Sequence, residues 1–258
     1  MTSPPLPPRS THRPGPPRRP EGLTSHAVLL GALSVAALAA CAKVGEDVLD
    51  HESGAFDEAI RDWMLAHRSA GVRRAFLAAT DVGSPSVLVP ASLAIATWLW
   101  RGRGRPIAAA VVTAPSLAAA LFVAVKHGYA RQRPAGAALL HQRTYSFPSG
   151  HATTSAAVLG TAGYVLWREK MLRGPAAAAV STVAPLLIGT SRVYLDVHWA
   201  TDVLGGWSAG ALVAVLSAIV YERVRVNTRE HGEPERPRRA PRRRVPPAAA
   251  AVSLEAAR

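Results

Sequence analysis

Cysteine is almost absent from this chain of 258 residues, with Cys41 as its only thiol. A single cysteine excludes an intramolecular disulfide and a thiolate metal cluster built from this chain alone. Acidic residues are also few, at 17 Asp and Glu against 30 Lys and Arg, which gives a net charge of +13. Because much of this charge lies in Pro-rich terminal segments and in short links between apolar runs, it favours a cytoplasmic membrane face over a nucleic-acid partner.

Hydrophobic residues make up 49% of the chain and gather in Ala-rich runs, which is typical of membrane proteins. Residues 1–25 and 222–258 are basic, contain many prolines and carry few large apolar side chains, so they cannot offset the entropy cost of ordering. We therefore predict one membrane domain over residues 26–221 between two disordered tails. The second tail is either held on anionic lipid or simply solvated.

The membrane domain contains six apolar segments of about the length needed to cross hydrocarbon. In chain order they cover about residues 26–44, 84–100, 106–125, 151–167, 175–194 and 199–221. Six crossings that start inside place both tails and the basic links 101–105 and 168–174 on one side, in line with the positive-inside tendency. The sequence thus predicts an all-α fold, a polytopic helical bundle of about six transmembrane helices in the cell (plasma) membrane, with both termini cytoplasmic.

Residues 45–82 separate the first two apolar segments and are rich in acidic side chains. Their apolar residues recur with helical spacing, which predicts amphipathic helices at the external interface. The first segment has two interpretations, because a basic leader and an apolar run ending in Leu38-Ala39-Ala40-Cys41 also resembles a bacterial lipoprotein signal. Both interpretations put residues 45–82 outside the cytoplasm. The oligomeric state of the protein is not indicated by the sequence.

Three polar clusters fall on the external side of this topology, where ionisable residues either function or snorkel as anchors. In the first, Lys126 closes a predicted helix, and Arg131 and Arg133 follow in a loop before Pro134. Arginine forms bidentate hydrogen bonds with phosphate oxygens and lysine is a compact point charge, so both suit a phosphate group. Anchoring of the third segment is the alternative explanation.

The second cluster, Phe147-Pro148-Ser149-Gly150-His151, stands where the fourth segment begins. Proline and glycine fix a turn that lets the backbone approach a ligand, and the free N–H groups of a helix start attract an anion. Ser149 and Gly150 are therefore candidate phosphate-binding residues, and His151 is a candidate to protonate a leaving oxygen. A helix cap followed by a packed histidine is the alternative.

The third cluster runs from Ser191-Arg192 to Asp202 and is the most informative. His198 and Asp202 are four residues apart, so at the start of a helix they share one face within hydrogen-bonding reach. A carboxylate on one imidazole nitrogen fixes the tautomer and leaves the other nitrogen to attack. Such pairs also occur as plain structural pairs, but the convergence of three phosphate-suited clusters on one membrane face favours His198 as a nucleophile that Asp202 orients.

The spacing of these residues resembles the signature motifs of the type-2 phosphatidic acid phosphatase and vanadium haloperoxidase superfamily, in its membrane lipid phosphatase branch. The motifs are Lys126-x6-Arg133-Pro134, Pro148-Ser149-Gly150-His151 and Ser191-Arg192-x5-His198-x3-Asp202. The resemblance covers about residues 26–221 and implies a helical bundle with its active site at the extracytoplasmic end.

The resemblance also implies a role for each matched residue. His198 would attack phosphorus to form a phosphohistidine, Asp202 would orient it, and His151 would protonate the leaving group and then activate water. The other matched residues would hold the phosphate, with no metal or other cofactor: Lys126, Arg133, Ser149, Gly150 and Arg192. Three polar residues are left out of this site, because one can serve packing and two fill variable positions: Ser191, Arg131 and Asp196.

The implied function is a phosphatase whose partners are membrane lipids and whose substrate is a lipid phosphate or diphosphate. Undecaprenyl diphosphate, phosphatidate and phosphatidylglycerol phosphate all stay open, with a slight preference for a prenyl diphosphate. A phosphotransferase that discharges the same phosphohistidine to an alcohol is the main alternative. The apolar segments disfavour a vanadate-dependent oxidase, and the combined presence of His151, His198 and Asp202 disfavours a non-catalytic lipid-binding scaffold.

Overall fold

The computed structural model describes residues 21–103 and 144–232 continuously and, between them, residues 108–109, 111–112, 117, 120, 125–126, 128–136 and 138–140. These residues form helices and no strand, which confirms the all-α fold class. The elements are α1 (Glu21–Leu49), α2 (Gly54–Ala66), α3 (Ala70–Val82), α4 (Pro85–Arg103), α6 (Gly150–Arg168), α7 (Gly174–Ala178), a π-helical turn η1 (Ala179–Val183), α8 (Ala184–Tyr194) and α9 (Ala200–Gly232).

The predicted apolar segments correspond to helices or helical runs, except that the third, at 106–125, lies largely outside the described residues. α1 starts at Glu21, ahead of the domain limit predicted at residue 26. α9 runs to Gly232, so residues 222–232 continue this helix instead of starting the disordered tail. The helix continues because Glu222 pairs with Arg168 of α6 at 2.5 Å and Arg225 lies 3.9 Å from Glu169, so the first turns of the expected tail have partners.

Three helical stretches are long and apolar enough to cross a membrane, namely Val28–Leu49, Gly174–Tyr194 and Ala200–Asn227. A fourth crossing results if α3 and α4, which are bent by 49° at their junction, form one span. The described residues thus contain three or four such spans, and the number six stays a prediction. α6 falls short in composition because it is largely interior, and its buried side chains include Thr153, Ser155 and Thr161.

The surface of α1 indicates contact with lipid. Large apolar side chains point outward along its length, with Val28, Val35 and Leu38 exposed by 72%, 69% and 57%. A contiguous apolar surface of this kind is unfavourable in water but matches the hydrocarbon of a bilayer. The chain is accordingly a multi-pass membrane protein.

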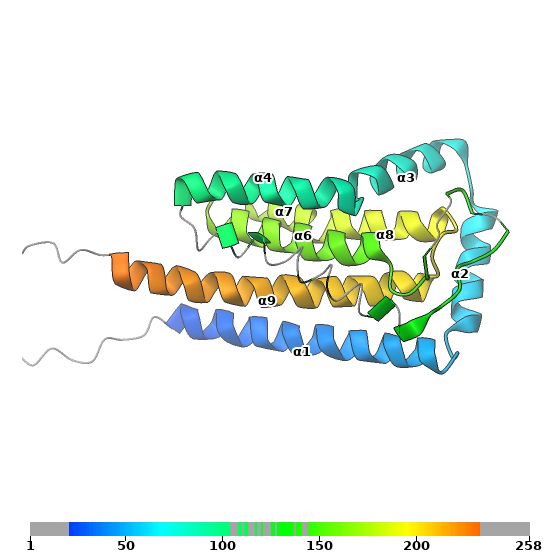
Figure 1. Cartoon of the computed structure of the whole chain (residues 1–258), viewed down its shortest axis with the longest axis horizontal. Helices are drawn as coiled ribbons and strands as arrows, with labels where there is room; N and C mark the ends of the chain where they lie inside the picture. The colour runs from blue at the N-terminus through cyan, green and yellow to red at the C-terminus, as the bar shows by residue number, and fades with distance from the viewer. Residues whose placement is uncertain are drawn as a thin grey trace, which may run out of the picture.

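α9 forms the centre of the bundle, with α1 on one side and α6 on the other (Figure 1). Glycines allow the close approach of α6 and α9, since a Cβ added to Gly160 would lie 2.9 Å from Cβ of Ala214. Small residues permit such backbone contact between membrane helices, where packing replaces the hydrophobic driving force.

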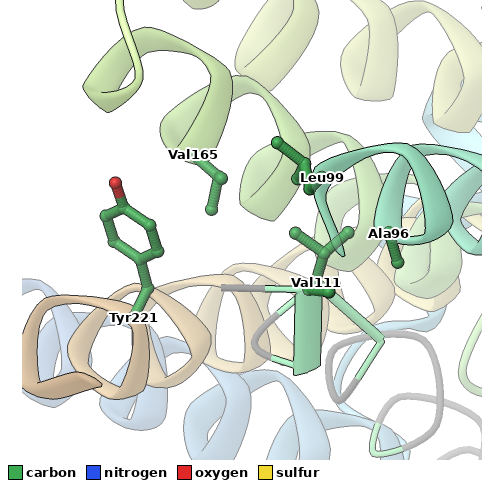
Figure 2. Close-up of a cluster of buried hydrophobic side chains, with 6 residues drawn as sticks. Ala96, Leu99, Val111, Val165 and Tyr221 are labelled. Carbon is green, nitrogen blue, oxygen red and sulfur yellow. The ribbon is translucent and has the colours of Figure 1, made fainter. Parts of the chain in front are cut away.

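One end of the bundle is closed by an apolar cluster. Figure 2 shows Ala96 and Leu99 of α4, Val111 from the following segment, Val165 of α6 and Tyr221 of α9 packed together. The opposite end holds the polar clusters. There α2 lies across the bundle, near the start of α6, the end of α8 and the start of α9 (Figure 1).

Candidate active site

His198 and Asp202 form a hydrogen-bonded pair at the N-terminus of α9. Nδ1 of His198 lies 3.3 Å from Oδ2 of Asp202, and both side chains are buried. Oδ2 also accepts the backbone N–H of Trp199 at 2.9 Å, as an acidic residue of the first helical turn does in a capping box. The contact that helps to start the helix therefore also aims the carboxylate at His198.

Arg133 faces the other nitrogen of the same ring. Nη1 of Arg133 lies 3.0 Å from Nε2 of His198. A guanidinium only donates, so Nε2 carries the lone pair and Nδ1 carries the proton that Asp202 accepts. Arg133 is fixed by donating to the backbone carbonyls of Val197, Thr144 and Tyr145. A positive charge thus lies beside the nitrogen that is expected to attack.

Ser149 and Arg192 bring buried donors that have no hydrogen-bond partner among the described residues. Within the described part of the chain, nothing hydrogen-bonds to Oγ of Ser149 or to Nε and Nη2 of Arg192, although both side chains are at most 1% exposed. Nη1 of Arg192 donates to Oγ1 of Thr80 on α3. The charge of Arg192 acts on His198, and the backbone N–H of Ser149 donates to the carbonyl of Asp202 at 2.9 Å. Because buried donors are costly to leave unpaired, this arrangement fits an anionic ligand beside His198.

The remaining predicted residues lie around the same point. His151 is half-buried in the first turn of α6, near enough to Arg133, Arg192 and His198 for their charges to act on its ring. Lys126 is buried and interacts electrostatically with Arg133 and Asp202. The structure therefore brings the predicted site residues to one end of the bundle: Lys126, Arg133, Ser149, Gly150, His151, Arg192, His198 and Asp202.

Burial sets the protonation of two of these groups. Desolvation lowers the pKa of His198 to about 4, and the charges of Arg133 and Arg192 oppose the raising effect of Asp202. Desolvation also lowers the pKa of Lys126 to about 8, with the charge of Arg133 acting in the same direction. At neutral pH His198 is neutral and Lys126 is mostly charged, which suits a nucleophile and a phosphate ligand.

Arg131, which the sequence analysis left out, contacts the site directly. Its Nη1 donates to Oδ1 of Asp202 at 2.8 Å, and its Nη2 donates to Oδ2 of Asp57 at 2.6 Å. Ser146 also donates its hydroxyl to Oδ2 of Asp202. Nothing in the sequence marks Asp57 as a buried partner, since it stands among other acidic residues of an amphipathic segment.

The two other omitted residues have structural partners. Asp196 has a backbone φ of 57° and forms an ion pair with Arg61 of α2, at 2.7 Å between Oδ1 and Nε. Ser191 donates its hydroxyl to the carbonyl of Ile188 within α8 at 2.6 Å. Both contacts fix the backbone near His198. The polar atoms of Asp196 and Ser191 bond to Arg61 and Ile188 in these contacts, and not to the histidine.

The ligand groups of this end suit an anion. Among the residues that the structure describes, no three His, Cys, Asp or Glu side chains are grouped to hold a metal ion. The charges of Arg133 and Arg192 act on His198, and Lys126 interacts with Arg133 and Asp202, so three cationic side chains and one carboxylate gather around the histidine.

Comparison with known proteins agrees with the motifs. The model of the PAP2 superfamily matches residues 107–225. Phosphatidylglycerophosphatase B of Bacillus subtilis (strain 168) is 31% identical over 163 residues, which cover 62% of this chain and 80% of that protein. Undecaprenyl-diphosphatase of Sulfolobus acidocaldarius is 34% identical over 77 residues, 28% of this chain and 32% of that protein.

A solved structure shares the arrangement of the helices. It is the crystal structure of a transmembrane PAP2-type phosphatidylglycerolphosphate phosphatase from Bacillus subtilis, with a TM-score of 0.68 and 27% sequence identity, covering 74% of this chain and 96% of that one. The fold and the three motifs thus define a membrane phosphatase, and the chain belongs to the PAP2 superfamily. The resemblance seen in the sequence is confirmed, as is the class of enzyme, a lipid phosphatase.

Proposed function

We propose that this chain hydrolyses the phosphate of a lipid phosphate or diphosphate through a phosphohistidine on Nε2 of His198. The observation that carries the proposal is the orientation of this ring. Asp202 contacts Nδ1, and the lone pair of Nε2 is directed at Arg133. Nearby are donors of Arg192 and Ser149 that have no partner in the described part of the chain. A nucleophile oriented by a carboxylate and surrounded by anion-binding groups matches the general logic of covalent phosphoryl transfer.

In the first step, a phosphate oxygen displaces Nε2 of His198 as the acceptor of the Nη1 hydrogen of Arg133. The freed lone pair attacks phosphorus, the bond to the lipid oxygen breaks, and His151 gives its proton to that oxygen. Because Arg133 and Arg192 are positive, His151 gains this proton most readily once the phosphate anion occupies the pocket. Asp202 stabilises the positive charge that develops on the imidazole.

In the second step, His151 takes a proton from water as the water oxygen attacks phosphorus. The P–N bond breaks, inorganic phosphate leaves, and the lone pair returns to Nε2 of His198. Arg133, Arg192, Lys126 and backbone N–H groups at Ser149-Gly150 would stabilise the negative charge on the phosphoryl oxygens in both steps. No metal or other cofactor is part of this proposal, since these groups supply the positive charge that Mg²⁺ supplies in other phosphatases.

The substrate is an amphiphile. An apolar cavity of about 210 Å³ adjoins the second motif, lined in part by Leu38, Val125, Phe147, Pro148 and Gly205. It suits part of a hydrocarbon chain whose phosphate lies at His198. Phosphatidylglycerol phosphate and undecaprenyl diphosphate are the two candidates that the named relatives favour.

The site is proposed to face the extracytoplasmic side of the plasma membrane. The N-terminus of α1 and the C-terminus of α9 lie together at the end opposite to α2 (Figure 1). Basic residues gather at that end, among them Arg101, Arg168, Lys170, Arg173 and Arg223. Such an excess of Lys and Arg marks the cytoplasmic side of a membrane protein.

Phosphate release by the detergent-purified protein in EDTA tests this function. The substrates are undecaprenyl diphosphate, phosphatidate, phosphatidylglycerol phosphate and a water-soluble ester. We expect His198→Ala to abolish release, while His67→Ala, at the exposed end of α2, retains it. With a substrate radiolabelled in its phosphate, the quenched wild-type protein should carry an acid-labile label from the phosphohistidine, and His198→Ala should carry none. Release that survives in folded His198→Ala would overturn the mechanism.

The phosphotransferase alternative uses the same residues and is separated by an acceptor test. Adding a primary alcohol should leave the yield of inorganic phosphate unchanged if water is the acceptor. A phosphorylated alcohol as the main product would show that the phosphohistidine is discharged to an alcohol instead.

A further inference from the structure

We propose that Arg131 and Asp57 are positioning residues for the nucleophile, acting through Asp202, an inference that rests on the proposed phosphohistidine chemistry. Neither residue belongs to the matched phosphate-binding positions. Arg131 contacts the Asp202 oxygen that His198 does not contact, and Asp57 of α2 contacts both Arg131 and Thr201 in the first turn of α9.

Arg131 bridges two buried carboxylates with its two terminal nitrogens. Nη1 donates to Oδ1 of Asp202 and to Oγ1 of Thr201, each at 2.8 Å. Nη2 donates to Oδ2 of Asp57 at 2.6 Å and to Oγ of Ser53 at 3.1 Å. The planar guanidinium makes this two-sided contact possible, and a lysine ammonium could not reproduce it.

Asp57 holds the helix start that carries Asp202. Its Oδ1 accepts the backbone N–H of Thr201 at 2.9 Å, and its Oδ2 accepts the hydroxyl of the same residue at 2.6 Å. A carboxylate at the N-terminus of a helix satisfies an N–H group that has no partner within the helix and complements the helix dipole. Here that carboxylate comes from α2, so the first turn of α9 is fixed from outside its own sequence.

The oxygens of Asp202 are divided between two tasks. Oδ1 contacts Arg131, while Oδ2 contacts His198, Ser146 and the N–H of Trp199. Arg131 therefore fixes the rotation of the carboxylate that presents Oδ2 to Nδ1. It also balances one of the two buried negative charges, which limits how strongly Asp202 draws a proton onto His198.

Titratable or charged groups from the neighbouring elements surround His198 and Asp202. They come from α2, the segment after Val125, α6 and α8: Asp57, Lys126, Arg131, Arg133, His151 and Arg192. Among the described residues, Arg131 is the cationic side chain that hydrogen-bonds directly to Asp202. Removing its charge leaves the carboxylate less neutralised, so His198 should bind a proton at higher pH.

The test compares Arg131→Gln with Arg131→Lys by measuring kcat, KM and the pH profile of kcat/KM. We expect both variants to lower kcat by about 10- to 100-fold, as loss of an outer orienting partner commonly does, with KM nearly unchanged. In Arg131→Gln the acid limb of the profile should move to higher pH. In Arg131→Lys, which keeps the charge, the limb should stay. Asp57→Asn should lower kcat in the same direction.

Arg61→Gln is a matched control. Arg61 also pairs with a buried carboxylate, Asp196, and its guanidinium lies 5.9 Å from the Trp199 ring, as that of Arg131 lies 5.7 Å from it. In the described structure Arg61 hydrogen-bonds to Asp196 and to the carbonyl of Ala135, and not to Asp202. The acid limb of the Arg61→Gln profile should therefore match that of the wild type. The inference is overturned if Arg131→Gln retains kcat and its pH profile has the same acid limb as that of Arg61→Gln. An active His198→Ala protein instead overturns the proposed function on which it rests.

Discussion

Gly206 of α9 lies against the backbone carbonyl of Ser149, so closely that a Cβ at Gly206 would stand 2.8 Å from that oxygen. The backbone of the second motif, at Ser149, therefore packs directly against α9 at Gly206, although the two residues are far apart in the sequence. Ser149 belongs to the proposed phosphate-binding turn, and Gly206 follows Asp202 by one helical turn. The position of this turn relative to His198 depends on the absence of a side chain at residue 206.

Gly206→Ala should lower kcat/KM by roughly 10- to 100-fold, because small displacements of positioned groups have effects of this size. The added methyl group must push Ser149 or Ala152 away from α9. Gly31→Ala is the matched control, since that helical glycine is exposed and has nothing within 4 Å of an added Cβ. Kinetics on a water-soluble ester measure the effect. Equal activity of the two variants would contradict the coupling.

The pH dependence of kcat/KM should show two limbs set by His198 and Lys126. In the proposed mechanism neutral His198 is the attacking form, so activity should fall as pH drops toward its pKa of about 4. The ammonium of Lys126 is present below its pKa of about 8 and lost above it, so phosphate binding weakens as pH rises through 8. We expect a plateau between about pH 5 and pH 7. Lys126→Arg, which stays charged, should extend the plateau upward, and an unmoved basic limb would exclude Lys126 as its source.

Arg192→Met should separate stability from ligand binding. The wild-type protein buries a guanidinium with two nitrogens that lack partners within the described residues, so its replacement should leave the unfolding temperature unchanged or higher. Orthophosphate at a hundredfold excess over its Kd should stabilise the wild type by about 2.7 kcal/mol and the variant far less. Thermal unfolding in detergent, with chloride at matched ionic strength, measures both. An equal gain in the variant would remove Arg192 from the anion site.

Tyr221→Phe should destabilise the bundle and leave catalysis intact. The fully buried hydroxyl of Tyr221 donates to Oε1 of Glu169, and its loss leaves that carboxylate with one donor fewer. We expect the free energy of unfolding to fall by about 1–3 kcal/mol. A double-mutant cycle with Glu169→Gln measures the coupling, and kcat is the control. A lowered kcat at unchanged stability would contradict this assignment.

The contact between His198 and Asp202 was predictable because its geometry is local. His198 and Asp202 are four residues apart at a helix start, and the period of the helix alone brings them together. The turn at Ser149 was predictable for a similar reason, since it directly precedes α6. Fold class followed from the apolar segments, which need only length and composition to be recognised.

The outer contacts of the site were not predictable in this way. Arg131 meets Asp57 across 74 positions and Asp202 across 71, and only tertiary packing determines those pairings. The sequence predicted amphipathic helices over residues 45–82, but it did not show which of their acidic residues are buried. Glu58 is exposed and Asp57 is only 1% exposed, because two neighbours on a helix point in different directions.

The composition of α6 shows the same limit from the other side. It was predicted as a membrane segment, yet its hydroxyl-bearing and small residues keep it below the hydropathy of a lipid-facing span. A membrane helix that is surrounded by other helices can carry small and hydroxyl-bearing residues at its contacts, so its mean hydropathy is lower than that of a lipid-facing helix. The extent of α9 was misjudged for a related reason, since Glu222 looks like the start of a polar tail until Arg168 is placed beside it.

Cys41 lies half-buried in α1, in the wall of the apolar cavity next to Phe147 and Pro148. Because the chain has no second thiol, a maleimide fluorophore or a nitroxide attaches to the wild-type sequence at one known position. The label would stand beside the proposed phosphate-binding turn without replacing any charged side chain around His198. The unmodified protein thus already contains a spectroscopic reporter position for following that turn when inorganic phosphate is added.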